Sequence, residues 1–227
     1  MTYTDDMIAP APWQLTGQGY LVAVYLPASF DESQHFVPPA LAASRRGRFA
    51  YVIFADYQQS DVGAYHELLY IGGSLQFPQR RHLSISKIYV SSQASVSNGQ
   101  RNWGIPKELA QFQVTYGTAK NNPDNIVLKT PMGEAIARLQ FCHYGWPLPV
   151  NTRFVPVKLR TLGQLWQQQY FFFSPEAQGH IQPARVQAWQ FDARYFPDLA
   201  KAKVVACFKV NDFNMIFPVP KTQAVEQ

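Results

Sequence analysis

The chain has 227 residues and a formal net charge of +5, and 47% of its residues are hydrophobic while only 15% are charged. Soluble domains carry about 25% charged residues, so this composition excludes disorder, and the positive charge is too dispersed for a nucleic-acid-binding surface. Since no run approaches the roughly 18 to 20 apolar residues that cross a bilayer, and the start MTYTDDMIAPAPW is acidic, we expect a cytoplasmic protein without a membrane or nucleic-acid partner.

Strands dominate the elements that the sequence predicts. The segments Tyr20–Leu26 and Arg48–Tyr57 carry apolar residues on both parities, which is typical of central strands covered on both faces. Further strands are predicted in chain order at Ala64–Ile71, His82–Ser91, Gln111–Tyr116, Asn125–Thr130 and Glu134–Tyr144, and the last third alternates again. Two connections between them, Gly117–Asp124 and the Pro131-Met132-Gly133 reversal, are predicted to close hairpins.

Helices are few. Ser92–Asn102 begins at a serine-rich cap, and Ser29–Val37 offers acidic residues for the positive end of a helix. Leu162–Phe173 suits either a helix, by the spacing of its leucines and tryptophan, or a strand, by its aromatic run. We therefore predict a mainly β protein, an antiparallel sheet or barrel in a single domain over residues 1–227, with loose tails at 1–12 and 221–227.

Several familiar kinds of site find no support in the sequence. The cysteines Cys142 and Cys207 have no C-x-x-C spacing, and the histidines have no metal-ligand spacing. The glycine pairs Gly17-x-Gly19 and Gly72-Gly73 are followed by no strand-turn-helix unit, and no Gly-x-Ser-x-Gly elbow is present. We predict neither a metal ion nor a cofactor, and no hydrolase chemistry.

The segment NWGIPKELA, Asn102–Ala110, places one lysine, Lys107, among apolar residues after a Gly-x-Pro turn. At its usual pKa near 10.4 a lysine is almost wholly protonated at pH 7, but burial in an apolar pocket can lower that pKa and free the amine. A nearby carboxylate would act in the opposite sense. Neighbours in an extended segment point to opposite faces, and in such a segment Glu108 faces away from the lysine's surroundings. Lys107 is therefore either a surface lysine or an amine nucleophile.

A second candidate is Glu67 in AYHELLYI. It shares the inward parity of a predicted strand with Tyr65, Leu69 and Ile71, and buried carboxylates are uncommon unless they are paired or functional. The alternatives are a proton-handling group and a core acid with a structural partner.

The motifs GAYHE, Gly63–Glu67, and GQRNWGIPKELA, Gly99–Ala110, together resemble the acetoacetate decarboxylase superfamily. The resemblance implies an antiparallel β domain, closed like a cone or barrel around a dry pocket, and a homo-oligomer. It also implies that Lys107 forms a Schiff base with a β-keto acid, that Glu67 orients groups or moves a proton, and that Tyr65 and Trp103 contribute to the substrate pocket.

This sequence also departs from the family pattern. Glu108 stands where the family decarboxylase has a second lysine, Gln18 where it has a pocket arginine, and Val52 where it has a second acid. Losing the arginine weakens the case for a carboxylate substrate. Arg101 is a candidate for a replacement charge, and a surface role for it is the alternative.

These observations give three hypotheses. The first is a lysine-imine enzyme acting on a small keto acid, a decarboxylase or a related carbon-carbon lyase. The second is a non-catalytic protein that keeps the pocket and binds a small apolar ligand. The third is a structural role in an oligomer through aromatic strands such as Tyr170–Phe173. Burial of Lys107 close to Glu67 is the observation that would favour the first.

Overall fold

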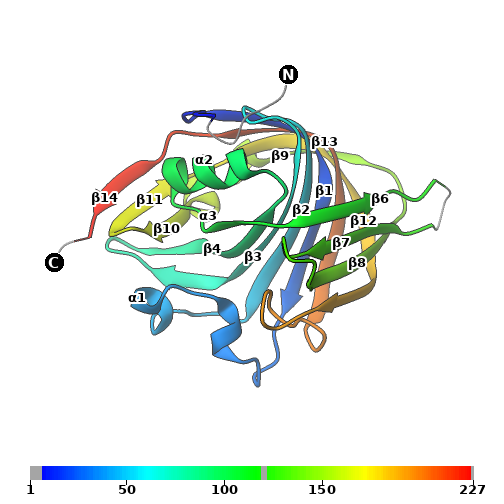
Figure 1. Cartoon of the computed structure of the whole chain (residues 1–227), viewed down its shortest axis with the longest axis horizontal. Helices are drawn as coiled ribbons and strands as arrows, with labels where there is room; N and C mark the ends of the chain where they lie inside the picture. Colours follow the sequence, from blue (N-terminus) through cyan, green and yellow to red (C-terminus); the bar gives the residue numbers. More distant parts are fainter. Residues whose placement is uncertain (1–6, 119–121, 226–227) are drawn as a thin grey trace.

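A computed structural model describes residues 7–118 and 122–225, whose strands form one strongly curved sheet (Figure 1). The strands are β1 (Trp13–Tyr25), β2 (Phe49–Gln59), β3 (Tyr65–Gln76), β4 (Arg81–Val90), β5 (Lys107–Leu109), β6 (Gln111–Thr115), β7 (Asp124–Lys129), β8 (Ala135–His143), β9 (Leu148–Asn151), β10 (Leu162–Trp166), β11 (Gln169–Phe173), β12 (Glu176–Phe191), β13 (Lys203–Phe217) and β14 (Lys221–Ala224). The helices are α1 (Pro39–Ala42), α2 (Gln93–Trp103) and α3 (Val157–Arg160), with 3-10 turns η1 (Glu32–His35) and η2 (Thr152–Phe154).

The strand order along the sheet is β14-β11-β10-β4-β3-β2-β1-β13-β12-β8-β7-β6, with β5 added beside β4 and β9 beside β12. Neighbouring strands are antiparallel, except that β4 pairs in parallel with β10 and with β5. The predicted mainly β, antiparallel fold is confirmed. Its barrel-like shape stays open, because β6 and β14 do not pair with each other within the described residues.

The strands β1 to β4 form the centre of the sheet, and hydrophobic cores lie on both of its faces. One face packs against β7, β8 and β12 through residues such as Val52, Leu68 and Leu139. The other packs against α2 and β11 through residues such as Ile71 and Trp103. Each large side chain buried in this way contributes about 1.5–3 kcal/mol. Apolar residues on both parities therefore predicted the central position of both segments correctly, but only Arg48–Tyr57 packs on both faces; in Tyr20–Leu26 the second parity is partly exposed.

Most predicted elements are present with small shifts at their ends. The predicted helix at 92–102 is α2, where the Ser92 side chain accepts from the Ser95 amide and Gly104 ends the helix with a φ of +62°. The predicted helix at 29–37 was wrong in extent, since only the short turn η1 forms, capped by Asp31. Both predicted hairpin connections join paired strands, β6 to β7 and β7 to β8.

The ambiguous segment Leu162–Phe173 is a β-hairpin of β10 and β11. Its two turn residues, Gln167 and Gln168, have φ angles of +47° and +60°. Two consecutive positive φ angles suit a tight two-residue hairpin, which is usually made with Asn and Gly. Because glutamine gives no such signal, the sequence alone could not separate the two alternatives.

The terminal segments expected to be loose are only partly described. Residues 1–6 and 226–227 lie outside the described residues, as do 119–121 in the first hairpin connection. Ala9 is buried and its amide donates to Asn98 Oδ1 at 2.9 Å, and Lys221–Ala224 form β14, paired with β11. None of the helices in the described part of the chain is long and apolar enough to cross a membrane.

His35 is buried at the end of η1 and predicts a pH dependence of stability. Its side chain is 1% exposed, its Nδ1 lies 2.9 Å from the Tyr70 hydroxyl, and burial lowers its pKa to about 4. Between pH 6.5 and 4 the unfolded chain takes up a proton at this histidine that the folded chain does not, so stability falls as pH falls. From pH 7 to 4.5 we expect a loss of roughly 2 kcal/mol from this group.

The measurement is urea unfolding at both pH values for the wild type and for His35→Phe. Other histidines also titrate in this range, so the quantity to compare is the difference between the two proteins. An equal loss in both would show that His35 does not have the lowered pKa.

Candidate active site

The end of α2 and the short strand β5 position Lys107. Gly104 turns the chain out of the helix, and a Cβ at this glycine would lie 2.6 Å from the Phe171 ring, so no larger residue fits. Residues 105 and 106 then lead into β5, where Lys107 pairs with Ile88 of β4 in parallel register. Lys107 is 5% exposed and points into the face of the sheet that α2 covers.

Glu108 points to the opposite side, as the alternation of an extended segment predicts. Its carboxylate lies 2.5 Å from Lys87 Nζ, and that ammonium also lies 4.8 Å from the centre of the Tyr89 ring. Glu108 therefore neutralises a different lysine and does not face the Lys107 amine.

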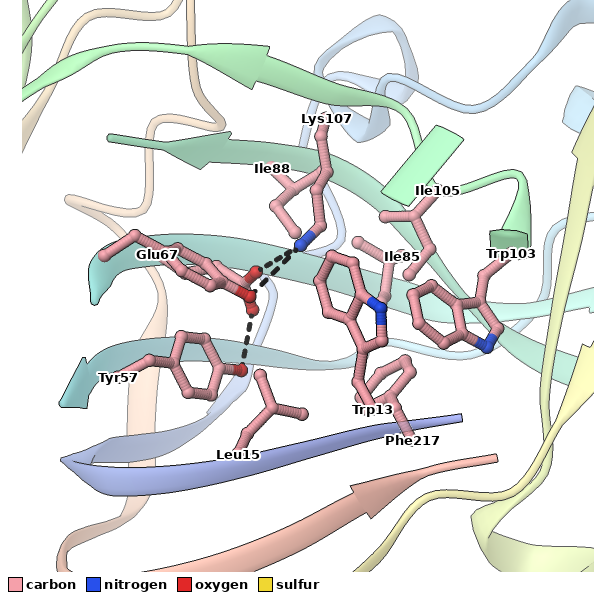
Figure 2. Close-up of a pocket in the computed structure, with 11 residues that line it drawn as sticks. Trp13, Leu15, Tyr57, Glu67, Ile85, Ile88, Trp103, Ile105, Lys107 and Phe217 are labelled. Carbon is pink, nitrogen blue, oxygen red and sulfur yellow. Dashed lines mark hydrogen bonds and ion pairs between the residues drawn. The ribbon is translucent and has the colours of Figure 1, made fainter. Parts of the chain in front are cut away.

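The carboxylate facing Lys107 is that of Glu67, from β3. Lys107 Nζ lies 3.0 Å from Glu67 Oε2, and the Tyr57 hydroxyl donates to Glu67 Oε1 at 3.1 Å. Figure 2 shows the lysine and the glutamate pointing toward each other, with Tyr57 beneath the glutamate. Glu67 is 4% exposed, so both members of this ion pair are buried.

Two further oxygens accept hydrogen bonds from the Lys107 ammonium. They are Ser95 Oγ at 3.0 Å and the Tyr65 hydroxyl at 3.4 Å. Burial lowers the pKa of Lys107, but the Glu67 carboxylate and Tyr65 outweigh it, and the pKa lies above its usual value. The pKa of Tyr65 is itself raised to about 12, chiefly by burial. In this arrangement Lys107 is an ammonium ion held by Glu67.

A small cavity lies against this ion pair, with a volume of about 20 Å³, which is room for about one water molecule. Its wall is otherwise apolar or aromatic, formed by Trp13, Leu15, Tyr57, Tyr65, Ile85, Ile88, Trp103, Ile105 and Phe217. The rings interlock edge to face, with centroids 5.0 Å apart for Trp13 and Trp103 and 5.2 Å apart for Trp103 and Phe217. The site is thus a charged pair in a tight apolar enclosure.

Four of the six site residues that the sequence suggested come together here, namely Lys107, Glu67, Tyr65 and Trp103. Gln18 does not line the cavity; it is half-buried, and its amide donates to Asp56 at 3.4 Å. Arg101 is exposed on α2. Within the described residues no group of three or more His, Cys, Asp and Glu side chains is arranged to hold a metal ion.

Sequence reasoning missed several residues of the site. Tyr57 and Trp13 lie on strands, and the alternation of each strand indicated which side chains point inward. An inward aromatic residue on a strand, however, more often belongs to the hydrophobic core than to a functional site. Ser95 lies one helical turn before Gly99, and both face Lys107 from α2. The serine-rich start of α2 signalled only a helix cap, so these roles depend on tertiary packing.

Gly99 is needed for Lys107 to pass along α2. A Cβ at this position would lie 2.6 Å from Lys107 Cδ and 2.8 Å from Cε. We expect Gly99→Ala to keep the fold, because alanine favours a helix interior by about 1 kcal/mol. We expect it to displace the amine and slow Lys107-dependent chemistry about 100-fold, since a 1 Å misplacement can cost that much.

The measurement combines thermal unfolding with the rate of amine labelling described below. Arg101→Ala, an exposed change on the same helix, is the matched control and should alter neither. Unchanged labelling in Gly99→Ala would show that the lysine has another route into the cavity.

A family model and several solved structures are similar to this chain. Residues 2–150 match the family model described as acetoacetate decarboxylase. Among solved structures, the fold is similar to acetoacetate decarboxylase from Legionella pneumophila, with 14% identity, a TM-score of 0.67, and 96% of this chain and 93% of that chain covered. An acetoacetate decarboxylase-like enzyme from Sphingomonas wittichii RW1 gives 10% identity, a TM-score of 0.68, and 96% and 95% coverage.

The enduracididine biosynthesis enzyme MppR, in complex with pyruvate, gives 16% identity, a TM-score of 0.62, and 95% and 91% coverage. No curated protein matches the sequence significantly. At such identities the structural likeness establishes the fold, and the family model carries the assignment.

Proposed function

Because the chain belongs to the acetoacetate decarboxylase family, we propose that it is an enzyme in which Lys107 forms an imine with a small carbonyl compound. The observation that carries this proposal is the buried pair of Lys107 and Glu67, 3.0 Å apart in an apolar cavity. An amine that adds to a carbonyl must lose a proton and later return one, and a carboxylate at this distance can do both.

The reaction begins with a proton transfer. Lys107 gives its extra proton to Glu67 as the substrate arrives, and the free amine adds to the substrate carbonyl. Glu67 then returns the proton to the leaving hydroxyl, so that water departs and an iminium ion remains, balanced by the glutamate carboxylate. The dry wall of Trp13, Trp103 and Phe217 limits the water that would hydrolyse the iminium ion.

The iminium ion accepts the electron pair of a bond broken on the adjacent carbon, and the resulting enamine is later protonated and hydrolysed. Two versions are considered: decarboxylation of a small keto acid, in line with the description of the family, and carbon-carbon bond formation or cleavage of the aldol type. For the second, the structural neighbour MppR has been described with the condensation product of pyruvate and imidazole 4-carboxaldehyde. A carbon-carbon lyase is the reaction class common to both.

Tyr57 and Ser95 support this chemistry by position. Tyr57 donates to the Glu67 oxygen that Lys107 does not contact, which fixes the carboxylate toward the amine. Ser95 accepts from Lys107 and orients it between the helix and the sheet. The homo-oligomeric state, the single domain and the cytoplasmic location remain predictions.

One observation favours a second candidate function. The pKa of Lys107 is raised by its carboxylate partner, whereas an amine that is free at neutral pH needs a lowered pKa. A protein that keeps this cavity only to bind a small apolar ligand would retain such an ion pair as a structural element. In that case the ligand binds and Lys107 never forms a covalent bond.

Reductive trapping separates the two functions. The protein is incubated with small ketones, aldehydes and keto acids and with sodium cyanoborohydride between pH 6 and 9, and the adducts are located by mass spectrometry. Labelling at Lys107 well above that at exposed lysines such as Lys158 and Lys201 supports the enzyme. Ligand binding without any adduct at Lys107 supports the binding protein.

A further inference from the structure

The cavity offers no positive charge for a substrate carboxylate. Of the side chains that line it, only Lys107 and Glu67 carry charge, and they neutralise each other at 3.0 Å. Gln18, which occupies the position of a pocket arginine in the family pattern, bonds to Asp56 outside the cavity, and Arg101 is exposed on α2. The charge of the enclosure is therefore zero before any substrate enters.

The neutral hydrogen-bond donors of the wall are also occupied. The indole nitrogen of Trp13 donates to the Ala9 carbonyl at 2.9 Å, and that of Trp103 donates to the Pro218 carbonyl at 2.7 Å. The Tyr57 hydroxyl donates to Glu67. The Tyr65 hydroxyl accepts from Lys107 and is also hydrogen-bonded to Ser95. The donors of the wall therefore already have partners, and none of them is set aside for a carboxylate.

The cavity also stays electrically neutral after the imine has formed. An iminium ion at Lys107 has the same charge as the ammonium ion it replaces, and Glu67 remains its counterion. A substrate carboxylate would add a negative charge with no partner in a water-poor enclosure, which is strongly unfavourable. An uncharged carbonyl compound adds none.

The small size of the cavity also disfavours a substrate carboxylate. About 20 Å³ is room for about one water molecule, so even a small ligand must displace the ring edges of Trp13, Trp103 or Phe217. A hydrated carboxylate would need still more room, or would have to lose its water without replacement.

We propose that this cavity selects a small uncharged ketone or aldehyde over α- and β-keto acids. The inference rests on the imine chemistry proposed above and narrows its substrate class. An uncharged substrate has no carbon dioxide to release, so the reaction proceeds through the α-carbon. Glu67 removes an α-proton from the iminium ion, the electron pair of that C–H bond forms the enamine, and the enamine takes up a proton or attacks an aldehyde.

The experiment compares pairs of probes that have nearly the same size and shape but differ in charge. Pyruvamide is compared with pyruvate, and acetoacetamide with acetoacetate, at equal concentration in the trapping assay on the full chain. Labelling at Lys107 is divided by labelling at the exposed Lys158 and Lys201, which corrects for the intrinsic reactivity of each probe. We expect the amides to label Lys107 at least about tenfold faster than the acids.

A second measurement isolates charge from shape. In Glu67→Gln the iminium ion at Lys107 loses its counterion with almost no change in cavity volume, so a substrate carboxylate could take that place and the preference for the amides should shrink or reverse. In deuterium oxide, the wild type should also exchange the α-hydrogens of acetone, and Lys107→Met should not.

Three outcomes are distinguishable. Faster labelling by the amides, with a reduced preference in Glu67→Gln, supports the inference. Equal or faster labelling by the acids overturns it and leaves the imine chemistry intact. No labelling of Lys107 by any probe overturns the proposed function, and the inference with it.

Discussion

Replacing Lys107 by methionine is expected to abolish trapping in the cavity and to lower the free energy of unfolding by about 3–5 kcal/mol. Methionine has nearly the length of lysine but carries no charge, so Glu67 would be left as a buried carboxylate without a cation. The pKa of Lys107 is raised in the folded state. The contribution of the ammonium is therefore fully present between pH 6 and 8 and is lost only as the pH rises through the raised pKa of Lys107.

Urea unfolding and mass spectrometry measure the two effects separately. The double variant Lys107→Met with Glu67→Gln removes both charges while keeping an acceptor for the Tyr57 hydroxyl. We expect it to regain most of the stability and none of the trapping. Trapping that persists in Lys107→Met would place the nucleophile elsewhere, and an unchanged stability would mean that the pair is solvated.

Replacing Glu67 by glutamine has the second largest expected effect. Without the carboxylate, burial becomes the main influence on the ammonium, so the pKa of Lys107 should fall below its usual value. Trapping should then reach half of its maximum at a lower pH than in the wild type. Turnover of any substrate should nevertheless fall about 10²–10⁴-fold, because the group that moves the proton is gone.

The pH profile of trapping at Lys107 is the measurement that checks this, and Glu108→Gln is the matched control. Glu108 follows Lys107 directly in the sequence, yet its carboxylate pairs with Lys87 on the other side of the strand. Replacing Glu108 should therefore leave the pH profile of trapping at Lys107 unchanged. A profile that shifts with Glu108→Gln and not with Glu67→Gln would reverse the assignment of the two acids.

Much of the fold could be predicted from the sequence, because side chains of a strand alternate between its two faces. A long strand buried on one or both faces therefore shows a recognisable pattern of apolar residues. Tyr20–Leu26 and Arg48–Tyr57 were predicted as central strands, and both lie in the middle of the sheet. Arg48–Tyr57 contributes to the cores on both faces, whereas Tyr20–Leu26 is buried on one parity only, with Tyr25 exposed on the other. The short strand β5 could not be predicted, since its three residues form a strand only because β4 lies beside them. The Gln167-Gln168 turn gave no signal either, because its positive φ angles are imposed by the strands that it joins.

The core of the site could be predicted and its surroundings could not. Lys107 and Glu67 were singled out as charged residues among apolar neighbours, and they lie 3.0 Å apart. Gln18 was a candidate by linear correspondence with the family pattern and Arg101 as a replacement for the missing charge, and the fold places neither in the cavity. Tyr57 contributes through a contact between β2 and β3, and Ser95 and Gly99 contribute through contacts between α2 and β5; no local sequence pattern indicates these contacts.

Because β5 has only three residues, the sign of the charge that it places inside the cavity depends on its register, and a shift of one residue would change that charge. Lys107 and Glu108 project to opposite sides of that strand, one toward Glu67 and the other toward Lys87. A deletion of one residue between Gly104 and Lys107 would bring Glu108 to the inward position, where it would face Glu67. An insertion of one residue would bring Lys107 to the outward position, where it would face Lys87. Two like charges would meet in either case. The length of this connection is thus under a constraint as strict as the identity of the lysine, and among natural relatives we expect substitutions here to be tolerated where changes in length are not.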